Sequence, residues 1–316
     1  MRISLEETGK KLLAAHKILI TAHVNPDGDA IGASLGLMQY LRAQGREAAV
    51  CIDDDIPATF AFLPGVDEII KPAGKDSGAD LLVVLDASLD RIGTVRECAP
   101  QAVLLNIDHH ISNDDKAELL YLDAGRAATA EIIYELLTLL QAKLSLDIAL
   151  PLYTGIATDT GFFRYSNTKP YTMRAGAELI AAGVQPNLVS EATEAKPYAL
   201  VKGMAAAMQT IEVMPDGRVA GLFLDQELTE TLDSTEGFID FVRVIEGVDV
   251  AVLIKCVADH VCRVSMRSKG TDVSQVAMRF GGGGHVRAAG CTLHMTLAEA
   301  KAAILSALAE AMGASV

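Results

Sequence analysis

Tryptophan is missing from this chain, and aromatic residues make up only 5% of its 316 residues. Proteins that bind long single strands without sequence preference stack the bases on aromatic side chains, so the composition argues against such a surface. Positive charge is also scarce, because 27 lysines and arginines stand against 41 aspartates and glutamates, and the formal net charge is −14. Long nucleic acid usually requires a basic face. We therefore expect small or short substrates.

No two cysteines show the CxxC spacing, and the five cysteines are scattered at positions 51, 98, 256, 262 and 291. We expect all of them to be reduced, buried thiols. The N-terminus lacks the apolar region of a signal peptide, and no apolar run approaches the roughly 18 residues that a membrane span needs. These absences predict a soluble cytoplasmic protein.

The first half of the chain alternates short apolar runs with helical patterns. The runs that predict strands cover residues 17–22, 47–52, 66–70, 81–85 and 102–107. Apolar strands that alternate with helices are typical of an α/β domain, with a mostly parallel sheet covered by helices on both faces. In such a sheet the ligand site lies beyond the carboxyl ends of the strands.

The second half carries hairpin patterns instead, around Pro215-Asp216-Gly217 and around Asp259-His260. This pattern predicts a smaller C-terminal α+β domain. We place the N-terminal domain at 1–185, a polar linker region at 186–205 and the C-terminal domain at 206–316.

Side chains that can bind metal follow three of the predicted strands. The first is followed by His-Val-Asn-Pro-Asp-Gly-Asp at 23–29, a later one ends in Asp86, and the next ends in Asp-His-His at 108–110. Asp159 lies near the end of a predicted helix. The candidate metal ligands are His23, Asp27, Asp29, Asp86, His109 and Asp159.

Carboxylates and imidazoles without a thiolate suit Mn²⁺ or Mg²⁺, with Co²⁺ or Fe²⁺ as further options, and not a closed structural zinc site. Six candidates exceed what one ion needs, so they indicate two ions, which require one shared carboxylate. Asp86 stands alone at the end of the middle strand, and we assign it the shared position. A pair of ions held in this way activates water for attack on phosphorus.

Each motif also has a plainer interpretation when it is taken alone. Asn-Pro-Asp-Gly at 25–28 is a turn sequence, Asp86 could cap the segment that follows it, and Asp159 could lie on a helix surface. Asp-His-His could be a loop with a hydrogen-bonded histidine. Their joint occurrence at the same end of successive strands favours the metal site.

A basic strand pattern in the second half predicts the residues that bind substrate. In Arg-Val-Ser-Met-Arg-Ser, the side chains of Arg263, Ser265 and Arg267 alternate onto one face, which suits a phosphate or a nucleotide. Downstream, the run Gly281–Gly284 precedes His285 and allows backbone N–H groups to approach an anion. A solvated strand face and a flexible linker are the plainer alternatives.

Four motifs, in order along the chain, resemble those of the DHH phosphoesterase superfamily. They are His-Val-Asn-Pro-Asp-Gly-Asp at 23–29, Val-Leu-Asp-Ala-Ser at 84–88, Asp-His-His at 108–110 and Thr-Asp-Thr-Gly at 158–161. Arg-Val-Ser-Met-Arg-Ser and Gly-Gly-Gly-Gly-His, followed by Ala288-Ala289-Gly290, resemble the DHH-associated C-terminal domain. The most similar group is the stand-alone bacterial oligoribonucleases that are also 3′-phosphoadenosine-5′-phosphate (pAp) phosphatases.

The resemblance implies a role for each candidate residue. One Mn²⁺ ion would be held by His23, Asp27 and Asp86. A second would be held by Asp29, Asp86, His109 and Asp159, with Mg²⁺ or Co²⁺ as alternatives. His110 would lie beside the scissile phosphate, so that the predicted catalytic residues are Asp86, Asp108 and His110. The substrate would be held by Arg263, Ser265, Arg267, Gly282, Gly283, Gly284 and His285.

The resemblance further implies exonucleolytic cleavage of short RNA to mononucleotides and dephosphorylation of pAp in the cytoplasm. The expected partners are short RNA and small nucleotides, without long duplex or membrane binding, and a homodimer is compatible with this group. A cyclic di-AMP or pApA phosphodiesterase is the alternative enzyme. A RecJ-type DNA exonuclease needs a longer chain, and a family II pyrophosphatase lacks the glycine-rich His motif. A nucleotide-binding regulator without activity would have lost metal ligands, and here all six positions are filled.

Overall fold

The computed structural model describes residues 1–232, 234–235 and 237–313. Residues 233, 236 and 314–316 of the predicted C-terminal domain lie outside the described residues. The chain divides into two compact units, residues 1–195 and 196–316.

Two helices occupy most of the segment 186–205, where the sequence predicts a polar linker. Helix α6 (Pro186–Glu194) belongs to the first unit, and helix α7 (Tyr198–Met208) begins the second unit. Both helices start next to a proline, which is pre-organised for a first helical turn. The division between the units therefore falls in a short stretch between two ordered helices.

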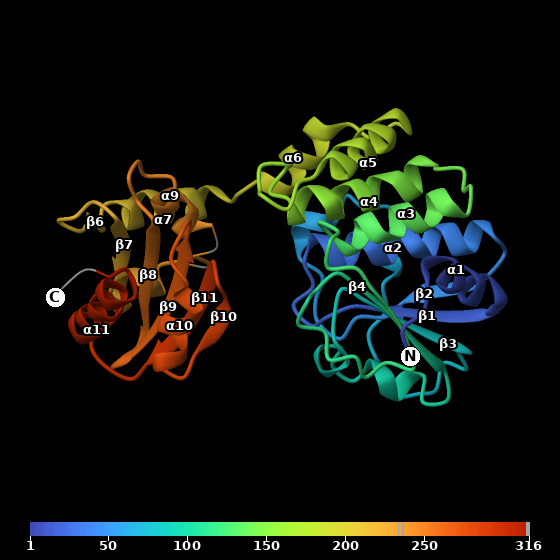
Figure 1. Cartoon of the computed structure of the whole chain (residues 1–316), viewed down its shortest axis with the longest axis horizontal. Coiled ribbons are helices and arrows are strands. Elements are labelled where there is room, and N and C mark those ends of the chain that lie inside the picture. The colour runs from blue at the N-terminus through green and yellow to red at the C-terminus, as the bar shows by residue number, and fades with distance from the viewer. Residues whose placement is uncertain (233, 236, 314–316) are drawn as a thin grey trace. The chain divides into compact units, whose positions relative to one another are not determined.

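A five-stranded, fully parallel sheet forms the centre of the first unit (Figure 1). Its strand order is β2-β1-β3-β4-β5. Its strands are β1 (Lys17–Thr21), β2 (Glu47–Val50), β3 (Leu81–Leu85), β4 (Val103–Asp108) and β5 (Leu119–Leu122). This sheet confirms the predicted α/β fold. The sequence pattern misses β5, which is only four residues long.

One predicted strand of the first unit is wrong. Residues 66–70 form the 3₁₀ turn η2 (Val66–Glu68), and only Ile70 makes a single parallel bridge, to Cys51. Gly65, at φ 82°, introduces this turn, and the left-handed backbone that glycine tolerates interrupts an extended run.

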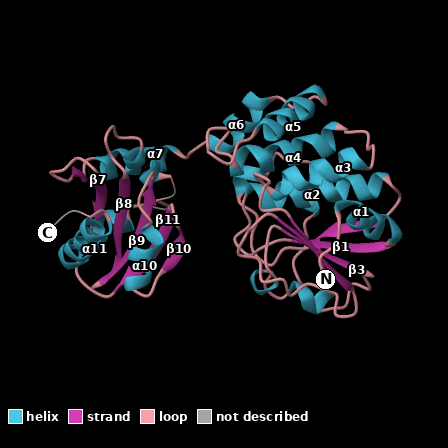
Figure 2. Cartoon of the chain, viewed as in Figure 1, coloured by secondary structure: helices cyan, strands magenta, loops and turns pink. Residues whose placement is uncertain are grey.

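Helices pack on one face of this sheet and shorter elements pack on the other (Figure 2). The helices are α1 (Leu5–Ala14), α2 (Gly28–Ala43), α3 (Thr129–Leu139), α4 (Leu146–Asp159) and α5 (Pro170–Ala181). The opposite face is covered by loops and by the 3₁₀ turns η3 (Leu89–Arg91) and η4 (Val95–Cys98). The α-helices expected on both faces are therefore found on one face only, because the segment between β3 and β4, which contains Gly93 and Pro100, forms 3₁₀ turns and loops.

Three glycines bring α2 unusually close to α4. Gly28, Gly32 and Gly36 recur every four residues, so they lie on one side of α2. A β-carbon at any of the three would overlap atoms of α4. The close approach places Asp29, in the first turn of α2, beside Asp159, in the last turn of α4.

The second unit is built on a six-stranded mixed sheet in the order β10-β11-β9-β8-β7-β6, in which only β7 and β8 are parallel. Its strands are β6 (Ile211–Val213), β7 (Val219–Leu224), β8 (Val250–Ala258), β9 (Val261–Ser268), β10 (Gly283–His285) and β11 (Ala288–Leu293). Its further helices are α8 (Gln226–Glu230), α9 (Phe238–Arg243), α10 (Val273–Arg279) and α11 (Leu297–Ala311). Helices α10 and α11 cover one face, while α7 and α9 cover part of the other. The architecture confirms the predicted smaller α+β domain.

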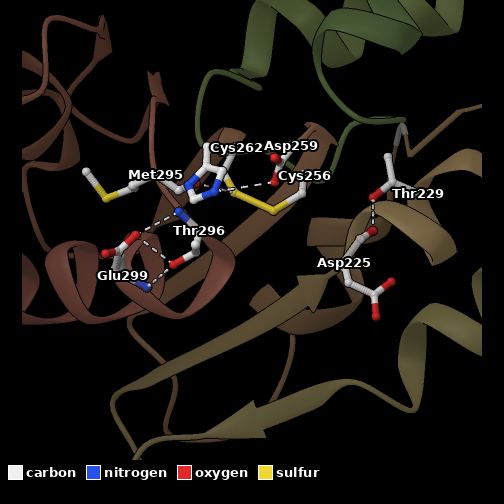
Figure 3. The surroundings of a disulfide bond; sticks show 9 residues. Asp225, Thr229, Cys256, Asp259, Cys262, Met295, Thr296 and Glu299 are labelled. Carbon is white, nitrogen blue, oxygen red and sulfur yellow. Dashed lines mark hydrogen bonds and ion pairs between the residues drawn. A yellow bond between two sulfur atoms is a disulfide. The ribbon is translucent and has the colours of Figure 1, made fainter.

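Cys256 and Cys262 form a disulfide across the β8–β9 hairpin (Figure 3). The expectation that all five cysteines are reduced is therefore wrong for this pair. The two residues are direct cross-strand partners with Cα atoms 4.1 Å apart. Their spacing in the sequence is not CxxC, so the sequence motif did not predict the pairing. Cys51, Cys98 and Cys291 are buried free thiols, as expected.

Within the described residues, none of the helices is both long enough and apolar enough to cross a bilayer.

Candidate active site and metal centre

The predicted ligands converge at the carboxyl ends of β1, β3 and β4. The chain runs from β1 through α2 to β2 on one side of β1, whereas β3 lies on the other side. Open α/β sheets bind their ligands at the strand ends beside such a reversal of strand order. Asp86, directly after β3, has φ 58°, a left-handed conformation that aspartate tolerates better than most residues and that is often retained at functional sites.

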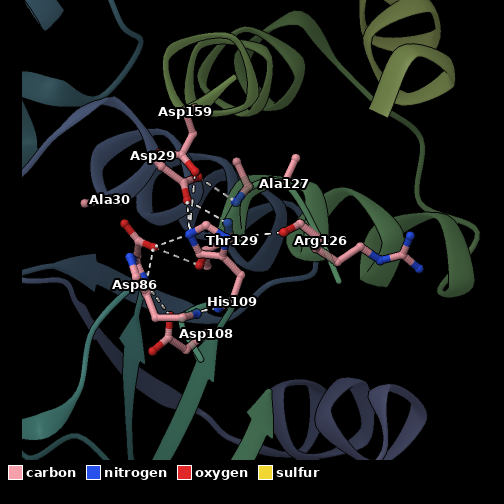
Figure 4. Close-up of polar contacts among 12 residues, drawn as sticks. Asp29, Ala30, Asp86, Asp108, His109, Arg126, Ala127, Thr129 and Asp159 are labelled. Carbon is pink, nitrogen blue, oxygen red and sulfur yellow. Dashed lines mark hydrogen bonds and ion pairs between the residues drawn. The ribbon is translucent and has the colours of Figure 1, made fainter. Parts of the chain in front are cut away.

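Asp86 lies between two groups of potential ligands. Figure 4 shows the group around His109, with Asp29 and Asp159. One oxygen of Asp86, Oδ2, is 3.6 Å from Nε2 of His23, and Oδ1 is 3.4 Å from Nε2 of His109. Asp27 completes the group on the His23 side, with Oδ2 3.7 Å from the same Nε2. Asp159 and Asp29 lie 3.6 Å and 3.9 Å from Nε2 of His109. The structure therefore brings together all six residues that the sequence predicts as ligands.

Backbone carbonyls orient the two ligand-type imidazoles. Nδ1 of His23 lies 2.8 Å from the carbonyl oxygen of Val24, and Nδ1 of His109 lies 3.3 Å from that of Arg126. A carbonyl only accepts, so each Nδ1 must carry the proton and donate. Nε2 of each ring therefore faces the carboxylates and is the atom that would bind a metal ion once its proton is displaced.

Helix α3 holds Asp29 in place from its N-terminus. The backbone N–H of Thr129 donates to one carboxylate oxygen (2.6 Å) and that of Ala130 to the other (2.7 Å). The Thr129 hydroxyl donates to Oδ1 of Asp86 at 3.0 Å. A single buried residue therefore contacts two of the ligand carboxylates, and its position at a helix start gives no signal in the sequence.

The charges of this cluster are incompletely balanced by the protein. Burial, and then the nearby Asp86 carboxylate, raises the pKa of Asp29, and burial raises the pKa of Asp159 to about 7. For His109, burial acts to lower the pKa, but the hydrogen bond to Asp86 and the other carboxylates raise it to about 10. A similar balance, with hydrogen bonds to Asp27 and Asp86, raises the pKa of His23 to about 10.

Divalent cations fit this donor set. Among the described residues, the ion pairs of Asp29, Asp86 and Asp159 are all with histidines, and none is with lysine or arginine. Clustered carboxylates buried without a fixed cation require protons or metal ions. The oxygen and nitrogen donors are those that Mn²⁺ and Mg²⁺ accept.

Asp108 supports the neighbouring histidine and is completely buried. Its Oδ1 accepts hydrogen bonds from Nδ1 of His110 at 2.9 Å and from the backbone N–H groups of His109 and His110. Its Oδ2 accepts from the Asn113 amide at 2.6 Å. The hydrogen bond that His110 donates to Asp108 raises the pKa of His110, against the effect of burial, while Nε2 of this half-exposed ring has no partner among the described residues.

Two asparagines extend this support into the sheet. Nδ2 of Asn113 also donates to Oδ1 of Asn106 at 2.8 Å, and the buried Asn106 donates to the carbonyls of Val84 and Ala87 on either side of Asp86. Because Asn106 is the lone polar residue within the apolar run 103–107 of β4, the sequence alone could have indicated a buried hydrogen-bonding role for it. The hydrogen bonds connect the His110 support to the loop that carries Asp86.

Asn167 ties two further parts of the site together. Its amide donates to the carbonyl of Ala127, before α3, and to the carbonyl of Asp159, at the end of α4. These two hydrogen bonds hold the segment before Thr129 and the segment of Asp159 at a fixed distance. Nothing in the local sequence indicates this role of Asn167.

The predicted substrate residues of the second unit share one sheet face. Arg263, Ser265 and Arg267 alternate along β9, and the register places Ala288 opposite Arg267 and His285 opposite Ala288. His285 therefore belongs to the same face as Arg267. Ser265, between the two arginines, has Gly290 as its cross-strand neighbour, so no side chain lies opposite it on β11.

The glycine run is strand as well as loop. Gly283 and Gly284 belong to β10 and pair with β11, where a free loop was one of the alternatives. Gly284 has φ 139°, and β-carbons at Gly282 or Gly284 would overlap carbonyl oxygens of β11. Close strand pairing therefore explains part of the glycine requirement, and it positions His285.

Comparison with known proteins is consistent with this arrangement. The family model described as "DHH family, N-terminal domain" matches residues 17–156, and the model of the DHHA1 domain matches residues 218–314. A Thermus thermophilus protein named bifunctional oligoribonuclease and PAP phosphatase NrnA is 36% identical over 93% of this chain and 89% of its own length. Its Bacillus subtilis namesake is 29% identical over 88% and 89%.

A solved structure shares the fold of the whole chain. The crystal structure of an exopolyphosphatase-related protein from Bacteroides fragilis has a TM-score of 0.90 and 26% identity, and it covers 97% of this chain and 95% of its own. The resemblance inferred from the motifs is thus confirmed. The chain belongs to the DHH family and consists of a DHH domain followed by a DHHA1 domain.

Proposed function

We propose that this protein is a metal-dependent phosphoesterase that hydrolyses short oligoribonucleotides to mononucleotides and removes a phosphate from pAp. The observation that carries the proposal is the position of Asp86, whose two oxygens face two separate histidine–carboxylate groups. A shared carboxylate between two ion positions is the arrangement that phosphoryl transfer by two metals requires. The names of the Thermus thermophilus and Bacillus subtilis relatives support the substrate class.

We assign one ion, Mn²⁺ in our proposal, to His23, Asp27 and Asp86. The second ion is assigned to Asp29, Asp86, His109 and Asp159. When bound, the ions would supply an activated water and neutralise charge on the phosphoryl oxygens. The protein contributes the fixed geometry, since the Val24 and Arg126 carbonyls aim the imidazoles and Thr129 holds two of the carboxylates.

His110 is the proposed proton donor. Asp108 accepts from its Nδ1, which fixes the ring and favours the protonated form, so that Nε2–H can donate to a phosphoryl or leaving oxygen. The buried oxygens of Asp108 are occupied by hydrogen bonds, so we assign Asp108 to positioning His110.

In this proposal, the DHHA1 domain recognises the far end of the substrate. Arg263, Ser265, Arg267 and His285 share a face that suits a terminal phosphate, and recognition of an end makes cleavage exonucleolytic. Gly282 packs closely against β11, and Gly283 and Gly284 pair with it, which positions His285 beside the same face.

A hydrolysis panel with Mn²⁺ tests the function. The substrates are RNA from dinucleotides to long strands, pAp, pApA, cyclic di-AMP, pyrophosphate and single-stranded DNA. We expect the highest kcat/KM for short RNA and pAp. A strong preference for long DNA, for pyrophosphate or for cyclic di-AMP would contradict the proposal.

A further inference from the structure

A lysine outside the recognised motifs lies beside the substrate face of the second unit. Lys255, on β8, is the direct cross-strand partner of Arg263 on β9, so their side chains project from the same face of the sheet. On the other side of Arg263, the register places Thr292 of β11. An ammonium, a guanidinium and a hydroxyl thus form one row across three strands.

This pair of cations lacks a carboxylate partner among the described residues. The Lys255 ammonium donates a hydrogen bond to the hydroxyl of Thr235 at 2.8 Å. Within the described part of the unit, neither Lys255 nor Arg263 forms an ion pair. Elsewhere in this unit, cations such as Lys301 and Arg279 are paired with glutamates. Like charges directly opposite one another destabilise a sheet, and burial together with Arg263 lowers the pKa of Lys255.

We propose that Lys255 and Arg263 together bind a phosphate group of the substrate, with Thr292 as a third donor. Lys255 is half-buried, whereas Arg263 and Thr292 are exposed, so the row leads from the covered part of the sheet into open solvent. An anion between the two cations removes their mutual repulsion. The inference rests on the proposed function and adds a specificity-determining residue to it.

The row of Lys255 is separate from the Arg267–His285 row. Arg263 and Arg267 are four residues apart on one strand, so the two rows are about 13 Å apart at about 3.3 Å per residue. One phosphate does not span that distance. A ligand with two phosphates, such as pAp or a 5′-phosphorylated dinucleotide, can engage both rows.

Calorimetry of the full-length protein in EDTA, which prevents turnover, tests the inference. The titrants are pAp and AMP, and the variants are Lys255→Met, Lys255→Arg and Lys301→Met. Methionine keeps most of the apolar length of lysine and removes its charge. The matched control, Lys301, lies in α11 on the opposite side of the same sheet.

We expect Lys255→Met to weaken pAp binding about tenfold, as the loss of a charge-assisted hydrogen bond predicts, and to change AMP binding less than twofold. Lys255→Arg should restore most of the affinity, and Lys301→Met should leave it within twofold. The melting temperature of Lys255→Met should equal or exceed that of the unaltered protein, since repulsion with Arg263 is relieved. With Mn²⁺, the KM for pAp should rise while kcat stays constant.

Unchanged pAp affinity in Lys255→Met would overturn the inference, as would equal losses for pAp and AMP. A lowered melting temperature with unchanged affinity would assign Lys255 to structure alone. Hydrolysis of pAp by the unaltered protein is measured in parallel. If the unaltered protein fails to cleave pAp and short RNA, the proposed function fails, whereas an active enzyme with unchanged Lys255→Met binding overturns the Lys255 assignment only.

Discussion

The two units of this protein concentrate charge of opposite sign and do so on different structural elements. In the first unit, buried carboxylates gather in loops beyond the ends of parallel strands, and histidines are their ion-pair partners among the described residues. In the second unit, cations and hydroxyl groups alternate along the exposed face of an antiparallel hairpin. The first arrangement attracts metal cations and the second attracts phosphates. The comparison indicates that chemistry and substrate recognition are assigned to separate units.

The largest expected effect is the loss of activity on removing Asp86. Asp86→Ala takes away the carboxylate shared by both proposed ions, and kcat/KM for pAp should fall by more than about a thousandfold. The fold should survive, because one of several mutually repelling buried carboxylates is removed. Circular dichroism checks the fold, and activity retained at saturating Mn²⁺ would contradict the shared position.

Removing the Thr129 hydroxyl should weaken metal binding without touching the ligands themselves. Thr129→Val eliminates the 3.0 Å hydrogen bond to Asp86 but keeps the backbone N–H that holds Asp29. Loss of such outer hydrogen bonds typically costs 10- to 100-fold in metal affinity, so we expect about tenfold in a Mn²⁺ titration. Thr129→Ser is the matched control and should bind Mn²⁺ normally. Equal affinities for the Val and Ser variants would contradict the role.

Removing His285 should affect the other unit alone. His285→Ala should raise the KM for pAp about tenfold, because a charged or polar contact to phosphate is lost. Both kcat and Mn²⁺ affinity should stay within twofold, because none of the proposed metal-binding residues is altered. Steady-state kinetics and a metal titration measure the three quantities. A fall in Mn²⁺ affinity would remove the distinction between the units.

The smallest expected effect is the release of protons on metal binding, which concerns the first unit alone and so tests its separation from the second. His23 and His109, with pKa values raised to about 10, bind protons in the metal-free protein at neutral pH. A metal ion displaces these protons, so Mn²⁺ affinity should rise with pH between about 6 and 9. Calorimetry in buffers of different ionisation enthalpy counts the protons. Absence of proton release at pH 7 would show that the metal ion does not displace protons from the two imidazoles.

The sequence was most informative where function sits in contiguous motifs. Three of the motifs follow strands that are easily predicted from their apolar runs: the loop at 23–29, Asp86, and Asp-His-His at 108–110. Parallel strand topology then brings these motifs together. Asp159 was predictable as a ligand from the resemblance, although it is the glycines of α2 that allow α4 to approach.

Residues whose roles depend on strand register or helix packing gave little or no signal. Lys255 meets Arg263, and Cys256 meets Cys262, only because β8 and β9 pair in one particular register. Thr129 contacts Asp29 and Asp86, which precede it by 100 and 43 residues, because α3 starts beside them. Sequence periodicity cannot predict contacts between residues so far apart along the chain. The local sequence pattern predicts helices and strands, whereas the side chains that support the site are brought to it by tertiary packing.

Nucleotide binding in the absence of metal tests the central claim most directly. Calorimetric titration of pAp in EDTA should give Asp86→Asn an affinity at least equal to that of the unaltered protein, because a negative charge is removed and the recognition face is intact. Arg267→Gln should bind pAp about tenfold more weakly, since a guanidinium contact to phosphate is lost. The reverse result, with Asp86→Asn weakened and Arg267→Gln unchanged, would contradict the assignment of recognition to the second unit.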